Sequence, residues 1–379
     1  MKSAALVARA SNAGLAGVGV FWGALAAFMP DLKAGIGASD AAFGLALMMA
    51  AVGGIAAMAV APRVMARLGR WGLPVAALGL ATMFFVPTLP RTAAEFGIAM
   101  MGIGAAVSLL DIGSNMRLSD IEARQGRHLM NFSHAMFSFA FAGSALVSSF
   151  ARKAGLGPVE ILPLLAPVLV LIAVLTWEGA GWHAPEPAPE GADRRTPWRP
   201  ILLAAVILLA SFVSENATET WSALHIERTL GGAAGNGGFG PVALGLTMGV
   251  GRLMGQVAAS RLGEAGLILW SALVAVVGAA VIALAPVPLV AVLGVGLLGL
   301  GVAVTVPSAN SILGKAVRAD QRGHAISRAW MIGFTGFFVG PSAMGAIAEG
   351  FGLRTAFLVV ALVVATIVPS VRALGRLQR

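Results

Sequence analysis

The sequence contains no cysteine and no tyrosine, and only 11% of its 379 residues are charged. Without cysteine there is no disulfide framework, no thiolate metal site and no cysteine nucleophile. A soluble domain has about 25% charged residues, so this chain has too few charges to cover a water-exposed surface. Intrinsic disorder is also excluded, because disorder requires low hydrophobicity and 58% of these residues are hydrophobic.

Long apolar runs make up most of the chain, and its mean hydropathy is +0.86. A helix needs about 20 apolar residues to cross a bilayer. The runs, divided by charges, Pro and Gly, predict an all-α polytopic membrane protein with twelve transmembrane helices. A signal peptide over residues 10–29 is the weaker interpretation, because no soluble domain follows. The predicted spans are 11–30, 41–62, 71–89, 93–116, 129–151, 158–177, 200–223, 237–260, 265–285, 288–313, 325–348 and 355–373.

The formal charge of +9 comes from basic residues that lie in short clusters between the apolar runs. This pattern is typical of a membrane protein and argues against nucleic-acid binding. Of the 26 Lys and Arg residues, 19 fall on the side of the N-terminus and one, Arg252, lies inside a span. Both termini are therefore predicted to be cytoplasmic, with the chain in the inner membrane. The opposite side holds Lys33, Arg91, Arg152, Lys153, Arg228 and Arg354.

A polar stretch rich in Pro and charge, residues 178–199, separates six predicted spans from the next six. We therefore expect a bundle over 1–177, a cytoplasmic linker and a second bundle over 200–379. The two parts also repeat each other. Ala66–Gly69 reads ARLG and Ser260–Gly263 reads SRLG. In addition, a set of three glycines and one leucine occurs twice, with a constant offset of 197 residues. That set is Gly126, Gly143, Gly155 and Leu156, which correspond to Gly323, Gly340, Gly352 and Leu353.

Several segments carry a resemblance to a known family. They include FWGALAAFMPDLKAGIGASDAAFGLALMM (21–49), DIGSN (111–115), NFSHAMFSF (131–139) and the Arg-rich loops after spans two and eight. With the central linker, they make the chain resemble the major facilitator superfamily over its whole length. More narrowly, it resembles uncharacterised bacterial inner-membrane permeases that are loosely similar to fucose permease and to rhizopine-associated membrane proteins. The resemblance implies two six-helix bundles with a substrate site between them.

One departure from the family pattern lies in the loop after span two. This loop, residues 61–70, contains no acidic residue, although an Asp is common there in the superfamily. The gating contact that such an Asp makes is therefore not expected in this chain.

Ionisable side chains inside a span are costly unless they face a cavity or a partner, so each one is a candidate site residue. Asp111 and Asn115 lie four residues apart in span four. Asn131, His134 and Ser138 share the same kind of spacing in span five. Each set therefore occupies one helical face. A purely structural hydrogen-bonding role for Asp111 and His134 remains the alternative.

Span seven is the most polar of the twelve. Glu215 and Glu219 lie one turn apart on it, beside Asn216, and two carboxylates so close together favour a shared proton. The alternative is that Glu219 reaches the outer interface. Arg252 in span eight needs a carboxylate, backbone carbonyls or an anionic substrate. A structural ion pair is the plainer interpretation.

Further polar and aromatic side chains complete the candidate cavity. We expect a kink at Pro307 in span ten, because proline removes a backbone hydrogen bond. Glycines such as Gly102 and Gly104 are interpreted as positions of close helix packing. The substrate-cavity candidates are Trp22, Asn115, Asn131, Ser138, Asn216, Ser308, Asn310 and Trp330.

The sequence thus predicts a secondary active transporter of a small polar solute, working by alternating access. No nucleotide-binding, protease or hydrolase motif is present, so we expect no enzyme activity, no catalytic residue, no metal and no cofactor. The transmembrane proton gradient is the expected energy source, with Asp111, Glu215, Glu219 and His134 as candidate proton carriers. Sodium coupling and facilitated diffusion fit the composition nearly as well.

Other functions stay open. Many Met, Phe and Leu residues leave proton-driven efflux of amphipathic compounds as the alternative to uptake of a polar solute. A non-transporting receptor, or an intramembrane enzyme using Asp111 and His134, fits less well. The expected partners are a small-molecule substrate, protons and the lipid bilayer, with the chain acting as a monomer.

Overall fold

The computed structural model describes residues 4–125, 129–179, 197–318 and 321–377, and within these residues it contains helices and no strand. The helices are α1 (Ala4–Val7), α2 (Arg9–Gly35), α3 (Asp40–Leu68), η1 (Gly69–Trp71), α4 (Gly72–Thr82), η2 (Met83–Phe85), α5 (Ala93–Gln125), α6 (Met130–Lys153), α7 (Pro158–Leu175), α8 (Trp198–Leu224), η3 (His225–Thr229), α9 (Phe239–Leu262), α10 (Glu264–Leu284), α11 (Pro288–Val302), α12 (Thr305–Ala316), α13 (Arg322–Phe334), α14 (Gly336–Ala365) and α15 (Ile367–Arg376). The all-α fold class is confirmed.

Nine helical stretches in the described residues are long and apolar enough to cross a membrane. Two of them are long: Asp40–Phe85 covers the predicted span 41–62 and most of 71–89, and Ala325–Arg376 contains 325–348 and 355–373. The remaining predicted spans also lie on helices. The multi-pass architecture follows, while the exact number of twelve crossings stays a prediction.

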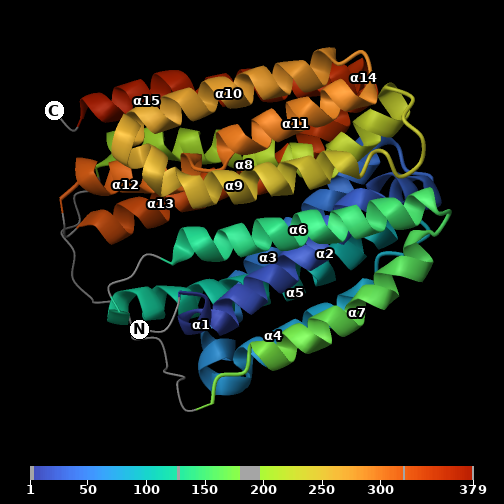
Figure 1. Ribbon diagram of the computed structural model, residues 1–379, viewed down its shortest axis with the longest axis horizontal. Coiled ribbons are helices and arrows are strands. Elements are labelled where there is room, and N and C mark those ends of the chain that lie inside the picture. Colours follow the sequence, from blue (N-terminus) through green and yellow to red (C-terminus); the bar gives the residue numbers. More distant parts are fainter. Residues whose placement is uncertain (1–3, 126–128, 180–196, 319–320, 378–379) are drawn as a thin grey trace.

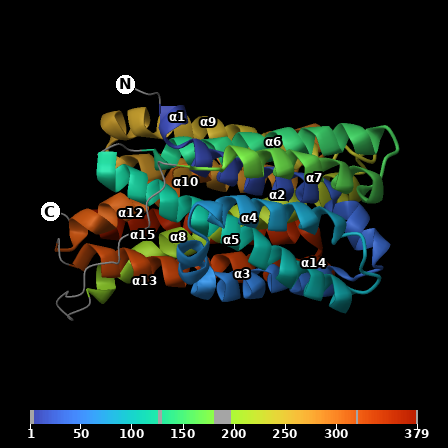
Figure 2. The same ribbon diagram turned by 90° about the horizontal axis from the view of Figure 1, so that it is seen from below.

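The helices form two groups that run along one another (Figure 1). The first group contains α2 to α7 and the second contains α8 to α15; we call them the first half and the second half. Two seams join them, because α6 packs along α9 and α3 packs against α14. Both termini lie at the same end of the molecule in the two views (Figures 1 and 2). We call this the near end, and the end with the turns 36–39, 154–157 and 230–238 the far end.

Apolar side chains cover the outside as well as the inside of this bundle. On α7, Leu164, Leu171 and Val174 are all strongly exposed, whereas Leu162 and Leu169 on the same helix are buried. Exposed apolar surface of this extent is rare on soluble monomers and suits contact with lipid. The helices therefore pack through one face and leave the other to the bilayer.

Glycines interrupt the helices at corresponding points of the two halves: Gly69, Gly155 and Gly263 follow the ends of α3, α6 and α9, and Gly352 joins two helical segments at a kink within α14. Gly69 and Gly263, which close the repeated ARLG and SRLG segments, have φ values of 55° and 69°. Gly155 and Gly352 have φ values of 83° and 82°. Residues with a Cβ rarely adopt this left-handed conformation, so glycine is favoured at all four positions. The repeat seen in the sequence thus coincides with equivalent breaks of the helices in the structure.

The two ends of the predicted linker contact different halves. Glu178 forms an ion pair with Arg117 of α5, with 2.6 Å between its Oε2 and the arginine Nε. Trp198 carries the guanidinium of Arg328 of α13 over its ring, 5.2 Å from the centroid. Residues 180–196 of the linker, and Gly126 of the repeat, lie outside the described residues.

The interruption that Pro307 predicts in span ten is present just upstream of the proline, whereas one expectation about glycine packing needs correction. The helix break in span ten falls at residues 303–304, between α11 and α12, and Pro307 lies in the first turn of α12. A proline ring clashes with the carbonyl four residues earlier, which places the break before Pro307. Gly102 is not a packing glycine, because a Cβ there would meet nothing within 4 Å, whereas one on Gly104 would lie 1.8 Å from the carbonyl oxygen of Ala50.

Candidate functional site

Polar side chains from four helices meet inside the bundle. Asp111 and Asn115 come from α5, His134 and Ser138 from α6, Glu215 from α8 and Arg252 from α9. We call these six residues the central cluster. The i, i+4 spacing on α5 and on α6 turns each pair toward its neighbours, and the cluster contains residues of both halves.

Arg252 connects the two halves of the cluster. Its Nη1 donates to the carbonyl oxygen of His134 at 3.1 Å and to Oγ of Ser138 at 2.5 Å. Its Nη2 lies 3.4 Å from Oε1 of Glu215, and both side chains are largely buried. One guanidinium therefore contacts α6 of the first half and α8 of the second half. The carboxylate and the carbonyl oxygen that the sequence required for this arginine are both present.

Within the first half, further hydrogen bonds connect His134 to Asp111 through Asn115. Nδ2 of Asn115 donates to the backbone oxygen of Asp111 at 2.9 Å and to its Oδ1 at 3.2 Å. Nε2 of His134 lies 3.2 Å from Oδ1 of Asn115. An amide oxygen only accepts hydrogen bonds, so His134 donates here and carries a hydrogen on Nε2. The contacts thus run from Asp111 through Asn115, His134 and Arg252 to Glu215.

Glycines on α9 bring Arg252 close enough to reach α6. A Cβ on Gly245 would lie 2.8 Å from the carbonyl oxygen of Ser138, and one on Gly249 would lie 2.7 Å from the ring of Phe139. These two positions are one turn apart and face α6 together. A side chain at either position would push the two helices apart at the level of the central cluster.

Glu219 lies one turn beyond Glu215 on α8 and interacts electrostatically with both Glu215 and Arg252. Of the two carboxylates, Glu215 forms the ion pair with Arg252. The interfacial role of Glu219 stays the alternative prediction. An additional proton near these three groups would balance their charges.

A second group of predicted residues lies against an aromatic cluster in the second half. Nε1 of Trp330 donates to Oδ1 of Asn310 at 3.0 Å. The indole ring packs on Phe212 of α8, with 5.4 Å between ring centroids. Phe212 also contacts Phe334 and Phe337, at 5.9 Å and 4.8 Å. We call these four rings the aromatic wall.

The other cavity candidates, Trp22, Asn131, Ser308 and Asn216, are more scattered within the described part of the chain. Trp22 is half-buried on α2 and packs edge-on against Phe21. Asn131 lies in the first turn of α6, and Ser308 is buried on α12. Oδ1 of Asn216 is buried without a hydrogen-bond partner among the described residues.

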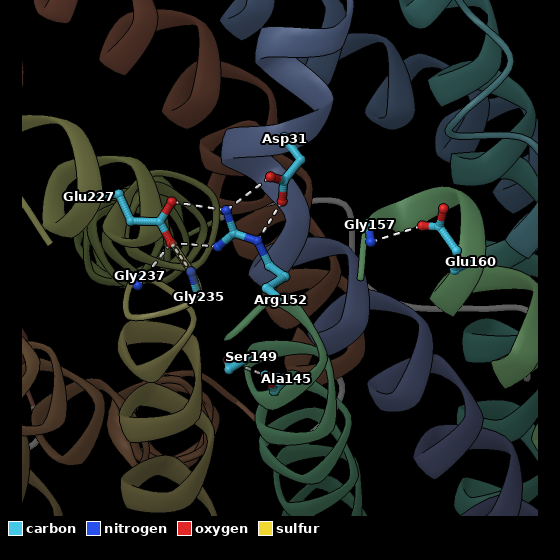
Figure 3. A network of polar contacts seen from close by, with 9 residues as sticks. All are labelled: Asp31, Ala145, Ser149, Arg152, Gly157, Glu160, Glu227, Gly235 and Gly237. Carbon is cyan, nitrogen blue, oxygen red and sulfur yellow. Dashed lines mark hydrogen bonds and ion pairs between the residues drawn. The ribbon is translucent and has the colours of Figure 1, made fainter. Parts of the chain in front are cut away.

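The sequence reasoning missed two ionic clusters at the far end. In the first, Arg152 contacts Asp31 and Glu227 (Figure 3). In the second, Asp40 contacts Lys33 and Arg228. From the sequence, these lysine and arginine residues served only to assign loops to a side of the membrane. The available signal was an acidic residue close in the sequence to two of them, Asp31 near Lys33 and Glu227 beside Arg228, whereas Arg152 has no acid close by.

Comparisons with known proteins agree with this architecture. A family model described as Major Facilitator Superfamily matches residues 204–374. An uncharacterised MFS-type transporter of Yersinia pestis is 28% identical over 371 residues, which cover 96% of this chain and 94% of that protein. Among solved structures, the nucleoside transporter NupG is similar with a TM-score of 0.71 and 15% identity, covering 99% and 100% of the two chains. A single-residue variant of the fucose:proton symporter FucP of E. coli is similar with a TM-score of 0.66 and 14% identity, covering 98% and 99%.

Proposed function

We propose that this chain, which belongs to the major facilitator superfamily, is a proton-coupled transporter that moves a small polar solute by alternating access. The membership rests on the matching family model, the MFS-type relative and the shared fold. The chain is accordingly a multi-pass membrane transporter and not an enzyme. The solute, the coupling and the mode of access are our proposal.

The observation that carries the proposal is the contact of Arg252 with both halves. The guanidinium binds the carboxylate of Glu215 in its own half and the backbone of His134 in the other half. The contacts of this guanidinium therefore depend both on the charge of Glu215 and on the distance between the halves. A residue with these contacts can link the protonation of Glu215 to the spacing of the two halves.

Protonation of Glu215 would remove the negative charge that holds Nη2 of Arg252. The ion pair is then weakened, and the guanidinium can donate to an oxygen atom of the solute instead. Asp111 is a second carboxylate, linked to the same arginine through Asn115 and His134. Asp111 and Glu215 are therefore our leading proton carriers, with Glu219 and His134 as further candidates.

The polar nature of the solute follows from the groups around Arg252. Amide, hydroxyl and carboxylate side chains line the central cluster, and such groups bind hydroxyl or amine functions through paired hydrogen bonds. The similarity to a fucose:proton symporter agrees with such a solute. We further propose two six-helix bundles, 1–177 and 200–379, joined by the linker 178–199. The chain would act as a monomer in the inner membrane, with cytoplasmic termini.

Efflux of amphipathic compounds is a second candidate function, favoured by the aromatic wall. Phe212, Phe334, Phe337 and Trp330 offer ring faces, which suit an apolar or aromatic solute more than a polyol. A thermal-shift screen of the purified protein against sugars, polyols, organic acids and drugs separates the two classes, because a ligand that binds the folded state raises the melting temperature.

The test of the proposal is solute-driven proton movement in proteoliposomes, using the solute that the screen identifies. Wild-type protein should move protons when a solute gradient is applied. Asp111→Asn and Glu215→Gln should lose this coupling, because each removes a carboxylate that could carry the proton. Glu160→Gln is the matched control, since this acid caps the start of α7, with its carboxylate accepting from the N–H of Gly157 at 2.8 Å.

The proposal is wrong if both variants accumulate solute against its gradient with a normal pH dependence. Release of a chemically altered product would contradict transport itself. Stabilisation by lipophilic drugs alone would favour the efflux function.

A further inference from the structure

Two basic and two aromatic side chains meet at the near end of the first half, away from the central cluster. The rings of Trp71 and Trp177 pack together with 4.2 Å between their centroids. The guanidinium of Arg70 lies over the ring of Trp177, 5.2 Å from its centroid. Nη2 of Arg9 donates to the carbonyl oxygen of Trp177 at 2.5 Å. The start of α2, the turn η1 and the residues after α7 therefore converge on one surface, and we call these four residues the near-end patch.

The positive charge of the near-end patch is not balanced by nearby acids. The sequence contains no Asp or Glu between Asp40 and Glu95. Glu178, which directly follows the patch, is engaged by Arg117 of α5 instead, with 2.6 Å between its Oε2 and the arginine Nε. Among the described residues, neither arginine of the patch has an acid within ion-pair distance. A ligand with negative charge would therefore find two unbalanced cations here.

The corresponding segment of the second half lacks this excess of positive charge. When the repeated segments ARLG and SRLG are aligned, Glu264 stands at the position of Arg70, and Ala265 at the position of Trp71. The carboxylate of Glu264 lies 2.9 Å from Nζ of Lys315. The near-end patch is thus a property of the first half alone, and the second half offers a matched comparison.

Exposed apolar side chains continue from the near-end patch toward the middle of the membrane. Helices α4 and α7 pack together along one edge of the bundle (Figure 1). Val75 and Leu78 of α4 are 43% and 45% exposed, and Leu171 and Val174 of α7 are 60% and 67% exposed. At 1.5 Å per residue, all four lie within about 10 Å of the patch along the helix axes. Tryptophan is enriched at the level of the lipid headgroups, so the patch lies at that level and the apolar side chains lie beside the acyl chains.

Both guanidinium groups retain donors for a ligand. A guanidinium has five N–H donors, and Arg9 uses its Nη2 on the carbonyl oxygen of Trp177. The guanidinium of Arg70 is attracted to the face of the indole, and its donors point outward in its own plane. Such a planar set of donors matches the oxygen atoms of a phosphate group. Basic pockets at the ends of membrane helices bind lipid headgroups through this chemistry.

We propose that the near-end patch binds one anionic phospholipid, with its phosphate between Arg9 and Arg70 and its acyl chains along the exposed faces of α4 and α7. A lipid such as phosphatidylglycerol keeps its net negative charge, whereas phosphatidylcholine carries an additional cation that the two arginines repel. The apolar side chains favour a lipid over a free phosphate ion or an acidic peptide, because acyl chains can cover them. The inference does not depend on the solute or on proton coupling.

A fluorescent reporter on a single introduced cysteine can test this site, because the chain has no cysteine of its own. Leu78→Cys places the reporter on α4 beside the proposed acyl chains. Leu273→Cys is the matched position on α10 of the second half, since the two leucines are 45% and 41% exposed. The protein is reconstituted in bilayers of phosphatidylglycerol and phosphatidylcholine, with bromine on the acyl chains of one lipid at a time. Bromine quenches a nearby fluorophore, so the ratio of the two quenching values measures the preference for phosphatidylglycerol next to each reporter.

The reporter at position 78 should show a clear preference for phosphatidylglycerol. Arg70→Gln should lower this preference by a factor of about 5, which corresponds to about 1 kcal/mol for one basic residue near a membrane surface. Arg9→Gln should act in the same direction. The reporter at position 273 should show a smaller preference, because Glu264 replaces the arginine there. Arg261→Gln is the control, since it removes an exposed arginine from the near end of the second half and should leave the value at position 78 unchanged.

Three results would overturn the lipid site. The first is an equal preference at positions 78 and 273, and the second is an unchanged preference at position 78 in both Arg70→Gln and Arg9→Gln. The third is an equal loss at position 78 in Arg261→Gln, which would show that the net charge of the protein attracts the lipid. Both arginines of the near-end patch are exposed, so their substitution should not prevent folding. A chain that shows the expected preferences but moves no protons would retain the lipid site and contradict only the proton-coupled function.

Discussion

Arg252 uses one guanidinium to contact two helices of different halves, and among the described residues it is the member of the central cluster that does so. A buried guanidinium needs acceptors for its donors, and here a carbonyl, a hydroxyl and a carboxylate supply them. Replacing Arg252 while Glu215 stays charged should therefore reduce the stability of the fold. The contacts of Arg252 also depend on the charge of Glu215. This double role leads to the first residue-level prediction.

Arg252→Met should destabilise the protein by about 3–5 kcal/mol, because it leaves Glu215 as an unpaired buried charge. Transport should be lost as well. Thermal unfolding in detergent and uptake in proteoliposomes measure the two effects. The matched control is Arg261→Met on the same helix, at an exposed position at its near-end terminus.

The double variant Arg252→Met with Glu215→Met separates the ion pair from mere side-chain packing. Replacing both charges by apolar groups of similar size should restore most of the stability but not the transport. Unchanged stability and unchanged transport in the single Arg252→Met variant would mean that the side chain simply extends to water.

At the central cluster, helical spacing predicts which residues share a face but not which helices face each other. The pairs Asp111 with Asn115 and His134 with Ser138 follow from i, i+4 geometry. The contact of Arg252 with Glu215 depends on how α8 and α9 pack, and sequence spacing carries no such information. The far-end clusters were missed for the same reason, since their members come from α2, α3, α6 and η3.

Helix α9 is the element whose position determines whether the central cluster forms. Its glycines 245 and 249 leave room for the backbone and aromatic rings of α6. Close approach of two backbones through small residues is a common way to join membrane helices. The distance between α6 and α9 is therefore set by the absence of side chains at these positions.

Gly245→Ala should reduce transport strongly and destabilise the protein by about 1–3 kcal/mol, the usual cost of overpacking. The reason is that the new Cβ would lie 2.8 Å from the carbonyl oxygen of Ser138, which is backbone and cannot rotate away. Uptake assays and thermal unfolding measure both effects.

Gly102→Ala is the control for this element, because a Cβ there meets no atom within 4 Å. It should leave transport intact and stabilise the protein by up to about 1 kcal/mol, since alanine is the better helix former. Equal effects of the two substitutions would show that helix propensity and not helix spacing is responsible.

Most helices could be predicted from the sequence because the apolar runs are long. The breaks inside these runs were harder to predict. The pairs Gly69 with Gly263 and Gly155 with Gly352 lie in segments that repeat in the sequence, and in the structure they are helix ends or, for Gly352, a kink within α14. The break at Thr335, between α13 and α14, has no proline nearby to signal it in advance. Local sequence marks a turn that requires glycine, but a break caused by packing leaves no such mark.

The whole molecule has two chemically different ends. At the far end, three of the six basic residues counted for that side, Lys33, Arg152 and Arg228, are engaged with acids. The near end holds both termini (Figures 1 and 2), and the sequence assigns 19 basic residues to that side. The six basic residues that the sequence assigns to the far-end side thus include the three that form ion pairs at the far end.

The orientation of this asymmetric molecule in the membrane is the last prediction. Basic residues near the ends of spans are retained on the cytoplasmic side, and acids contribute little to this rule, so the ion pairs at the far end do not change the count. We therefore expect the near end, with both termini and residues 178–199, to be cytoplasmic and the far end to face outward.

In intact cells, an impermeant maleimide should label Ala154→Cys in the far-end turn and leave Ala188→Cys in the linker unmodified. Permeabilised cells, in which both should react, are the control. Labelling of Ala188→Cys alone in intact cells would reverse the orientation.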